Sequence, residues 1–280
     1  MRLVTSAADP SAGPLALGDG RWLTAPAGFA GGAAVGLLGG LVGLGGAEFR
    51  LPLLLGVFGF AALAAVIVNK AMSLVVVIAA IPARLAAVPL DDVVGQWPVV
   101  LNLLAGSLVG AWLGASWATR MATSTLYRIL AALLVFIAAV FAAERIGTLP
   151  TLDLTEPVQL VVGTVAGFGI GVVAALMGVA GGELLIPTLV LLFAVDVKLA
   201  GSLSLVVSLP TMLVAFFRYS RDQAFAVLAS NKRFVAAMAA GSVTGSVVGG
   251  LLLGVVPEVV LVPLLVALLL FSAVKVWRHA

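Results

Sequence analysis

The sequence predicts an all-α integral membrane protein made of two inverted repeats, each with about four long transmembrane helices plus one short or re-entrant helix. Three observations lead to this fold class: an apolar composition, a glycine-rich break that occurs twice, and opposite charges on equivalent loops. Hydrophobic residues make up 62% of the chain and charged residues only 10%, whereas a soluble domain carries about 25% charged residues. We therefore expect a lipid bilayer, rather than water, to surround the chain.

Ten hydrophobic segments follow residues 1–25, which we expect to form a flexible cytoplasmic tail. Most segments are long enough for a bilayer core, which takes about 20 helical residues. The segments 48–60 and 183–195 are too short for an upright span. In order, the segments run over 26–43, 48–60, 64–89, 97–118, 124–143, 157–178, 183–195, 199–218, 232–254 and 257–277.

Each short segment follows a glycine-rich break and carries a glutamate and then a proline. At one constant spacing, Gly43, Gly46, Glu48 and Pro52 correspond to Gly178, Gly181, Glu183 and Pro187. The same spacing relates Gly106, Gly110 and Gly114 to Gly241, Gly245 and Gly249, whose separation favours close packing of helices. These matches indicate an internal duplication, with repeats over 26–145 and 157–280 and an extracytoplasmic linker over 146–156.

The loop charges suggest how the two repeats are oriented. The loop after the third segment is acidic, with Asp91 and Asp92, whereas its counterpart is basic, with Arg218, Arg221, Lys232 and Arg233. The following loop reverses this bias, with Arg120 and Arg128 in the first repeat and only Glu258 in the second. Because basic residues favour the cytoplasmic side, equivalent loops should lie on opposite sides of the membrane. Both termini are then expected in the cytoplasm of a bacterial cell, with the chain in its inner membrane.

The composition also argues against several classes of function. The chain has no cysteine and a single histidine, His279, so a thiolate site and a histidine-based metal cluster are excluded. No HExxH, P-loop or nucleophile-elbow motif is present, so we expect no enzyme and no cofactor. The net charge of +3 comes from scattered basic residues, which does not indicate nucleic-acid binding. A monomer and a homodimer are both compatible with the sequence.

Glu48 and Glu183 are the first candidates for a functional role. An ionisable group inside a membrane costs several kcal/mol unless it is paired, hydrated or protonated. Each glutamate opens a short helix, where free backbone N–H groups and the helix dipole favour a negative charge. One interpretation is that each carboxylate simply caps its helix. The other is that both line a transport cavity and couple transport to protons.

Further polar residues near the breaks complete the predicted substrate site. Lys70 could contact Glu48 or an anion, or lie at the membrane interface, and serines could donate hydrogen bonds to a ligand or bond to their own backbone. Arg50 and Lys70 have no charged counterpart in the second repeat, so we expect the first repeat to hold the charge of an anion. The predicted substrate-binding residues are Gly45, Gly46, Ala47, Glu48, Lys70, Ser73, Gly181, Gly182, Glu183, Ser202 and Ser204.

The two breaks resemble a family signature. Gly43 to Leu54 (GLGGAEFRLPLL) and Gly178 to Leu189 (GVAGGELLIPTL) are both similar to the Gly-x-Gly-Gly-Gly-x-x-x-x-Pro-x-Leu motif of the TauE/SafE sulfite exporter family, which includes permeases like those for 4-toluene sulfonate uptake. The segment from Asp196 to Ser204 is similar to the family's segment after the short helix, and the resemblance covers nearly the whole chain after residue 26. The sequence departs from the motif at Ala47 and Ala180, and by carrying a glutamate after the glycines.

The resemblance implies a secondary transporter that exports a small sulfur oxyanion, sulfite or an organosulfonate. Backbone N–H groups of the short helices would hold the oxyanion near the middle of the bilayer. A fixed negative charge beside an anion is unfavourable, so the glutamates should be protonated, bind a coupling cation, or pair with Lys70 or Arg50. The alternative is a channel-like or non-transporting membrane protein, but the long segments show no continuous polar stripe.

Overall fold

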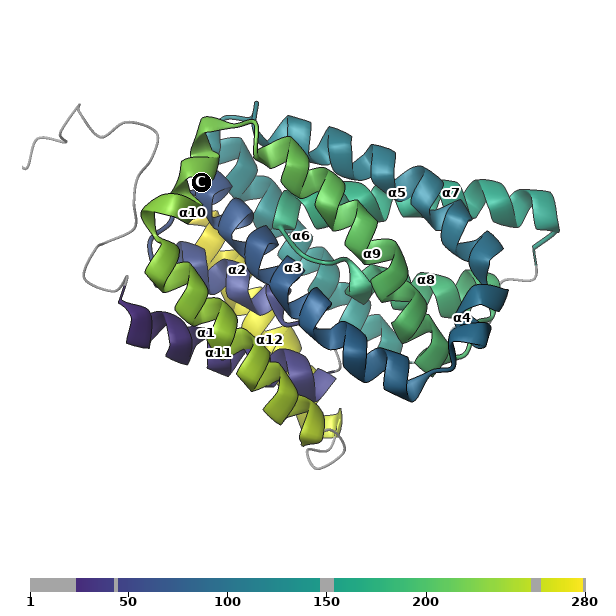
Figure 1. Cartoon of the computed structure of the whole chain (residues 1–280). Helices are drawn as coiled ribbons and strands as arrows, with labels where there is room; N and C mark the ends of the chain where they lie inside the picture. Colours follow the sequence, from purple (N-terminus) through teal and green to yellow (C-terminus); the bar gives the residue numbers. More distant parts are fainter. Residues whose placement is uncertain (1–23, 43–44, 147–153, 253–257, 279–280) are drawn as a thin grey trace, which may run out of the picture.

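The structure is a computed structural model that describes residues 24–42, 45–146, 154–252 and 258–278. The predicted tail over 1–25 and linker over 146–156 lie largely outside these ranges. All regular structure in the described residues is helical (Figure 1). The elements are α1 (Ala25–Val42), α2 (Ala47–Gly56), α3 (Ala62–Ala87), α4 (Leu90–Gly95), α5 (Trp97–Ala118), α6 (Thr123–Ile146), α7 (Glu156–Met177), α8 (Gly182–Phe193), α9 (Val197–Tyr219), η1 (Gln223–Phe225), α10 (Ala226–Ser230), α11 (Lys232–Leu251) and α12 (Glu258–Trp277).

The helices confirm the prediction of an all-α membrane protein. Six of those in the described ranges, α3, α5, α6, α7, α9 and α11, are long and apolar enough to cross a bilayer. Each of the ten predicted segments corresponds to one helix. The short elements α4, η1 and α10, which join the long helices, were not predicted.

The two halves of the chain repeat the same series of helices. The helices α2, α3, α5 and α6 each begin at one constant spacing before their counterparts α8, α9, α11 and α12, and α1 and α7 begin at a spacing four residues shorter. The backbone repeats as well: Gly46 and Gly181 precede α2 and α8 with φ of 67° and 88°. Gly59 and Ala194 follow these helices at equivalent positions, with φ of 69° and 51°. Positive φ is rare outside glycine, so the duplication extends to conformation.

Helices from different repeats form the closest pairs. α1 packs along α11, and α5 packs along α7 (Figure 1). The two pairs are equivalent, because α7 is the counterpart of α1 and α11 is the counterpart of α5. A Cβ atom at Gly36 would collide with the carbonyl oxygen of Ser242, and one at Gly110 with that of Phe168. The close packing predicted for six glycines is therefore confirmed, since a Cβ would meet backbone of the partner helix at Gly106, Gly110, Gly114, Gly241, Gly245 and Gly249.

Each short helix runs back along the helix that precedes it. Gly46, at the start of α2, lies against Val35 and Gly39 of α1, and Leu53 near its end lies against Gly31. In the second repeat, Gly181 lies against Ala174 of α7. At the far end of α8, the Gln159 amide donates to the carbonyl oxygen of Leu192 at 2.5 Å. The short helices therefore begin beside the second half of α1 and α7.

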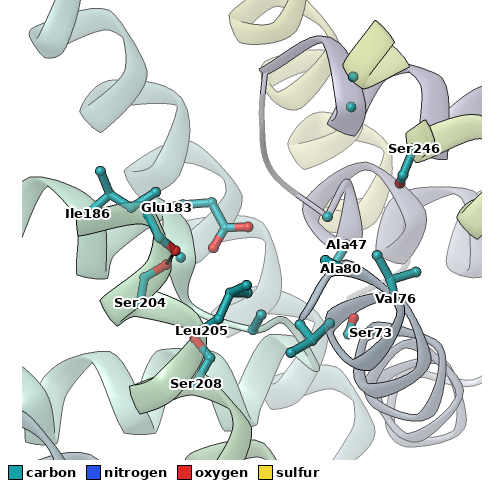
Figure 2. Close-up of a pocket in the computed structure, with 17 residues that line it drawn as sticks. Ala47, Ser73, Val76, Ala80, Glu183, Ile186, Ser204, Leu205, Ser208 and Ser246 are labelled. Atoms are coloured by element: carbon teal, nitrogen blue, oxygen red, sulfur yellow. Dashed lines mark hydrogen bonds between the residues drawn. The ribbon is translucent and has the colours of Figure 1, made fainter. Parts of the chain in front are cut away.

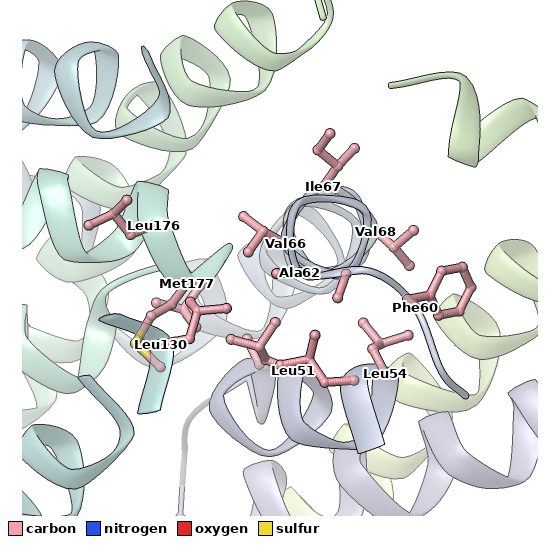
Figure 3. Close-up of a cluster of buried hydrophobic side chains, with 14 of the residues drawn as sticks. Leu51, Leu54, Phe60, Ala62, Val66, Ile67, Val68, Leu130, Leu176 and Met177 are labelled. Carbon is pink, nitrogen blue, oxygen red and sulfur yellow. The ribbon is translucent and has the colours of Figure 1, made fainter. Parts of the chain in front are cut away.

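The helix α3 occupies the centre of the protein. Val66, Ile67 and Val68 point from it in different directions, and Leu51 and Leu54 of α2 pack beneath it (Figure 3). A helix that is apolar on all sides is expected to be buried on all sides. This position lets side chains of α3 reach both glycine breaks.

α3 and its counterpart α9 run in opposite directions. Lys70, in the first third of α3, donates to the carbonyl oxygen of Ala174 at 2.7 Å. Tyr219, the last residue of α9, donates to the carbonyl oxygen of Ala175 at 2.9 Å. The beginning of α3 and the end of α9 thus meet the same end of α7.

Candidate functional site

A single buried amide joins the two glycine breaks. Asn69 of α3 donates from Nδ2 to the carbonyl oxygen of Ala47 at 3.0 Å and to that of Met177 at 2.9 Å. Ala47 begins α2, and Met177 ends α7 just before the second break. Asn69 is fully buried, and the breaks therefore lie on either side of one side chain at the centre of the protein.

The second break is held by the neighbours of Asn69. Lys70 donates from Nζ to the carbonyl oxygens of Ala174 at 2.7 Å and Val179 at 2.6 Å. Ser73 donates from Oγ to the carbonyl oxygen of Gly178 at 3.1 Å. The last carbonyl groups of a helix lack partners within it and carry partial negative charge, which a lysine satisfies well. Lys70 is fully buried, so its side chain does not extend to the surface of the protein.

The first break is held by Arg50 of α2. Its Nη2 donates to the carbonyl oxygen of Gly45 at 3.1 Å, and its Nη1 lies 3.4 Å from Ser73 Oγ and 3.5 Å from the carbonyl oxygen of Asn69. Arg50 is fully buried as well. Arg50 and Lys70, the two basic residues without a charged counterpart in the second repeat, thus both donate hydrogen bonds to backbone carbonyls around the breaks.

A cavity of about 250 Å³ lies where the two breaks approach each other. Residues from α8 and α9, including Glu183 and Ser204, face residues from α2 and α3, including Ala47 and Ser73 (Figure 2). Apolar side chains make up much of the wall. The lining residues are Gly40, Gly45, Ala47, Ser73, Val76, Val77, Ala80, Ala180, Gly182, Glu183, Ile186, Gly201, Ser204, Leu205, Ser208, Ser246 and Gly250.

The N-termini of both short helices border the cavity. No side chain caps α2 at Gly46 or α8 at Gly181. The first N–H groups of a helix have no acceptor within it, and Ala47 and Gly182, the first residues of the two helices, line the cavity. Two helix N-termini at one cavity provide N–H donors and partial positive charge for an anion.

Four serine hydroxyls add further polar groups to the cavity. Ser73 and Ser204 use their hydroxyls to bond backbone carbonyls, with Ser204 Oγ 2.8 Å from the carbonyl oxygen of Gly201. The Oγ atoms of Ser208 and Ser246 are buried and have no hydrogen-bond partner among the described residues. Buried polar groups normally have partners, so these two hydroxyls are free to bind a ligand.

The two glutamates occupy different places. Glu183 lines the cavity, whereas Glu48 is fully buried beside it. The two carboxylates are close enough for their charges to interact. Glu48 also interacts with Arg50, and Glu183 interacts with Lys70. The site therefore holds two acidic and two basic groups within one buried cluster.

The structure brings six of the eleven predicted site residues to the cavity and leaves five outside it. The six are Gly45, Ala47, Ser73, Gly182, Glu183 and Ser204. Of the other five, Gly46, Gly181, Glu48 and Lys70 lie just behind it, as helix caps or buried charges, and Ser202 lines a separate apolar hollow beside α4.

Ser246 is a polar lining residue that the sequence did not reveal. It lies on α11 next to Gly245, within a run of small residues that predicts only helix packing. Its approach to the cavity depends on the pairing of α11 with α1, which joins distant parts of the chain. The only sign in the sequence that Ser246 lines a polar site was its hydroxyl group within a run of small residues.

Comparison with known proteins gives one match. The family described as "Sulfite exporter TauE/SafE" matches residues 27–276, nearly the whole chain. No curated protein and no solved structure matches the chain.

Proposed function

The chain belongs to the sulfite exporter TauE/SafE family, and from this premise we propose that it exports a small sulfur oxyanion, sulfite or an organosulfonate, across the bacterial cytoplasmic membrane. Membership of this family and six apolar helices make the chain a multi-pass membrane transporter. The identity of the anion and its coupling to protons are the proposal.

The observation that carries the proposal is the cavity between the two uncapped helix N-termini. The N-termini of α2 and α8, at Ala47 and Gly182, border the same space and give it partial positive charge. The unpartnered hydroxyls of Ser208 and Ser246 supply donors from two further helices. An oxyanion with three oxygen atoms can accept hydrogen bonds from several directions at once, which suits this arrangement of donors.

Glu183 and Glu48 are proposed to couple export to protons. A carboxylate at the cavity would repel the anion, whereas the protonated carboxyl could donate a hydrogen bond to it. Glu48 is fully buried next to a second carboxyl group, so its charged form would cost several kcal/mol. We infer that a proton on this pair moves outward together with the anion, so that the outward concentration gradient of the anion drives both.

Efflux from vesicles tests the proposal. Vesicles that contain the purified protein would be loaded with sulfite, and its efflux measured over a range of pH, with thiosulfate, sulfate, sulfoacetate and taurine as competing anions. We expect Glu183→Gln and Glu48→Gln to slow efflux at least tenfold and to remove its dependence on pH, because Gln cannot release a proton. Glu156→Gln, at the start of α7, serves as the control and should behave as wild type.

Unchanged rate and pH dependence in both glutamate variants would remove the coupling role. Failure of wild-type vesicles to release any of these anions faster than protein-free vesicles would contradict the proposed substrate class.

We infer that the two repeats have inverted topology. The opposite directions of α3 and α9, and the return of α2 along α1, support an odd number of crossings in each repeat. With basic loops inside, α3 would end on the extracytoplasmic side and both termini would be cytoplasmic. The two short helices would then approach the middle of the bilayer from opposite sides.

A further inference from the structure

The centre of the cavity is lined by equivalent residues of the two repeats. Three pairs of equivalent residues line it, one member from each repeat: Gly45 with Ala180, Ala47 with Gly182, and Ser73 with Ser208. A ligand at this centre would therefore contact the same kinds of group from both repeats.

Away from this centre, the cavity is lined by residues whose equivalents in the other repeat do not line it. It extends past Ile186 and Leu205 to Ala80, each of which is partly exposed. The residues at the equivalent positions are all fully buried, namely Leu51, Lys70 and Ala215. The cavity is therefore open beside Ile186, Leu205 and Ala80, whereas side chains are tightly packed at the three equivalent positions.

We propose that Leu51, Lys70 and Ala215 line a second branch of the transport path, closed in this conformation, and that Lys70 binds the anion when this branch opens. The inference rests on the proposed transport function and on the inverted repeats, because exchanging the conformations of two inverted repeats exchanges the open and closed sides. In the proposed orientation, the open branch faces the extracytoplasmic side and the closed branch faces the cytoplasm.

The chemistry of the two branches differs. The open branch has Leu205 and Ser204 at the positions where the closed branch has Lys70 and Asn69. Lys70 now bonds two backbone carbonyls, and the oxygen atoms of an anion could replace these carbonyls as acceptors. A charge-assisted hydrogen bond is stronger than a neutral one, so the cytoplasmic-facing state should bind the anion more tightly.

Such a difference in affinity affects the two faces of the transporter unequally. It lowers the concentration needed for capture in the cytoplasm and favours release outside. It does not alter the final gradient, because a transporter changes the rates of the two directions and not the overall equilibrium between the two compartments.

Thiol labelling tests the second branch, since the native chain has no cysteine. Ile186→Cys and its counterpart Leu51→Cys would be placed in oriented vesicles and treated from each side with a membrane-impermeant maleimide. We expect Ile186→Cys to react from the outside and Leu51→Cys only from the cytoplasmic side. Conditions of pH or sulfite that speed one reaction should slow the other.

Ala80→Cys and Ala215→Cys provide a second matched pair, in case the loss of volume at Leu51 disturbs folding. Labelling of both members of a pair from the same side would overturn the proposal. Absence of labelling at both Leu51→Cys and Ala215→Cys, under conditions in which transport proceeds, would also overturn it. Because labelling requires no particular substrate, failure of sulfite efflux with opposite-sided labelling intact would count against the substrate alone.

Transport kinetics test the role of Lys70 itself. Lys70→Met should raise KM for sulfite roughly ten- to hundredfold when sulfite is supplied at the cytoplasmic face, as expected for a lost charged hydrogen bond. KM at the outer face should remain within about twofold, and Lys70→Arg should restore part of the loss. An equal rise in KM at both faces would contradict a contact made in only one conformation.

Discussion

Asn69 shows how one buried polar residue can organise a membrane site. Its amide nitrogen binds carbonyl oxygens from both glycine breaks, and the residue is completely enclosed. Irregular backbone at membrane depth needs internal partners for its polar groups. Asn69 supplies them to both breaks at once, so it stabilises the region that the cavity requires.

Replacement of Asn69 by Leu should destabilise the protein. The change keeps the branched shape of the side chain but leaves the carbonyl oxygens of Ala47 and Met177 without this donor, at a cost of about 1–3 kcal/mol each. We expect a clearly lower unfolding temperature in detergent. Asn231→Ala, which removes a bond to Val227 near the surface, should change stability by no more than about 0.5 kcal/mol. Equal unfolding temperatures for Asn69→Leu and wild type would show that these bonds contribute little.

Single residues were predictable where helical periodicity decides their position. Ser204 and Ser208 lie four residues apart, on one face of α9, and both reach the cavity. Ser202 lies on another face and lines a different hollow. The contacts of Lys70 could not be predicted in this way, because its partners are backbone carbonyls of a distant helix and carry no sequence signal.

At the scale of elements, α7 contains a test of close helix packing. A Cβ atom at Gly171 would collide with the carbonyl oxygen of Ser107 on α5, whereas one at Gly169 would meet nothing within 4 Å. Gly171→Ala should therefore destabilise the protein by about 1–3 kcal/mol. Gly169→Ala should be neutral or stabilising by up to about 1 kcal/mol, since Ala favours helix.

Unfolding of the two variants in detergent would compare these effects within a single helix. A similar loss of stability in both would mean that helix propensity or lipid contact, rather than the α5–α7 contact, limits what these positions tolerate.

The long helices were predictable because their apolar length is unusual. The short elements α4, η1 and α10 were not, because helices of a few residues have no clear periodicity. The pairing of helices was only partly accessible: the glycine spacing on α5 and α11 indicated close contact, but not that the partners would be α7 and α1.

At the scale of the whole molecule, the orientation of the repeats can be tested at two equivalent exposed positions. Gly95 ends α4, and Ser230, its counterpart, ends α10. With inverted repeats, Gly95→Cys should react with an impermeant thiol reagent only from outside the cell, and Ser230→Cys only from the cytoplasm. The absence of native cysteine removes background labelling. Labelling of both positions from the same side would contradict inversion.

The duplication and the family were evident in the sequence because the motif of glycines, glutamate and proline occurs twice. The asymmetry of the cavity was not, since it depends on how distant helices pack around the two breaks. Glu48 and Glu183 occupy equivalent positions in the motif, yet one is enclosed and the other faces the cavity.

The exchange of partners between repeats also has a consequence during synthesis. α1 leaves the ribosome early, but α11, which it packs against, is made only after most of the chain. At a synthesis rate of about 5–20 residues per second, the delay is roughly 10–40 s. During this time, the glycine face of α1 must rest against lipid or the insertion machinery. Each repeat is thus a unit of sequence but not a unit of folding, and a ribosome-bound first half should remain unassembled in the membrane.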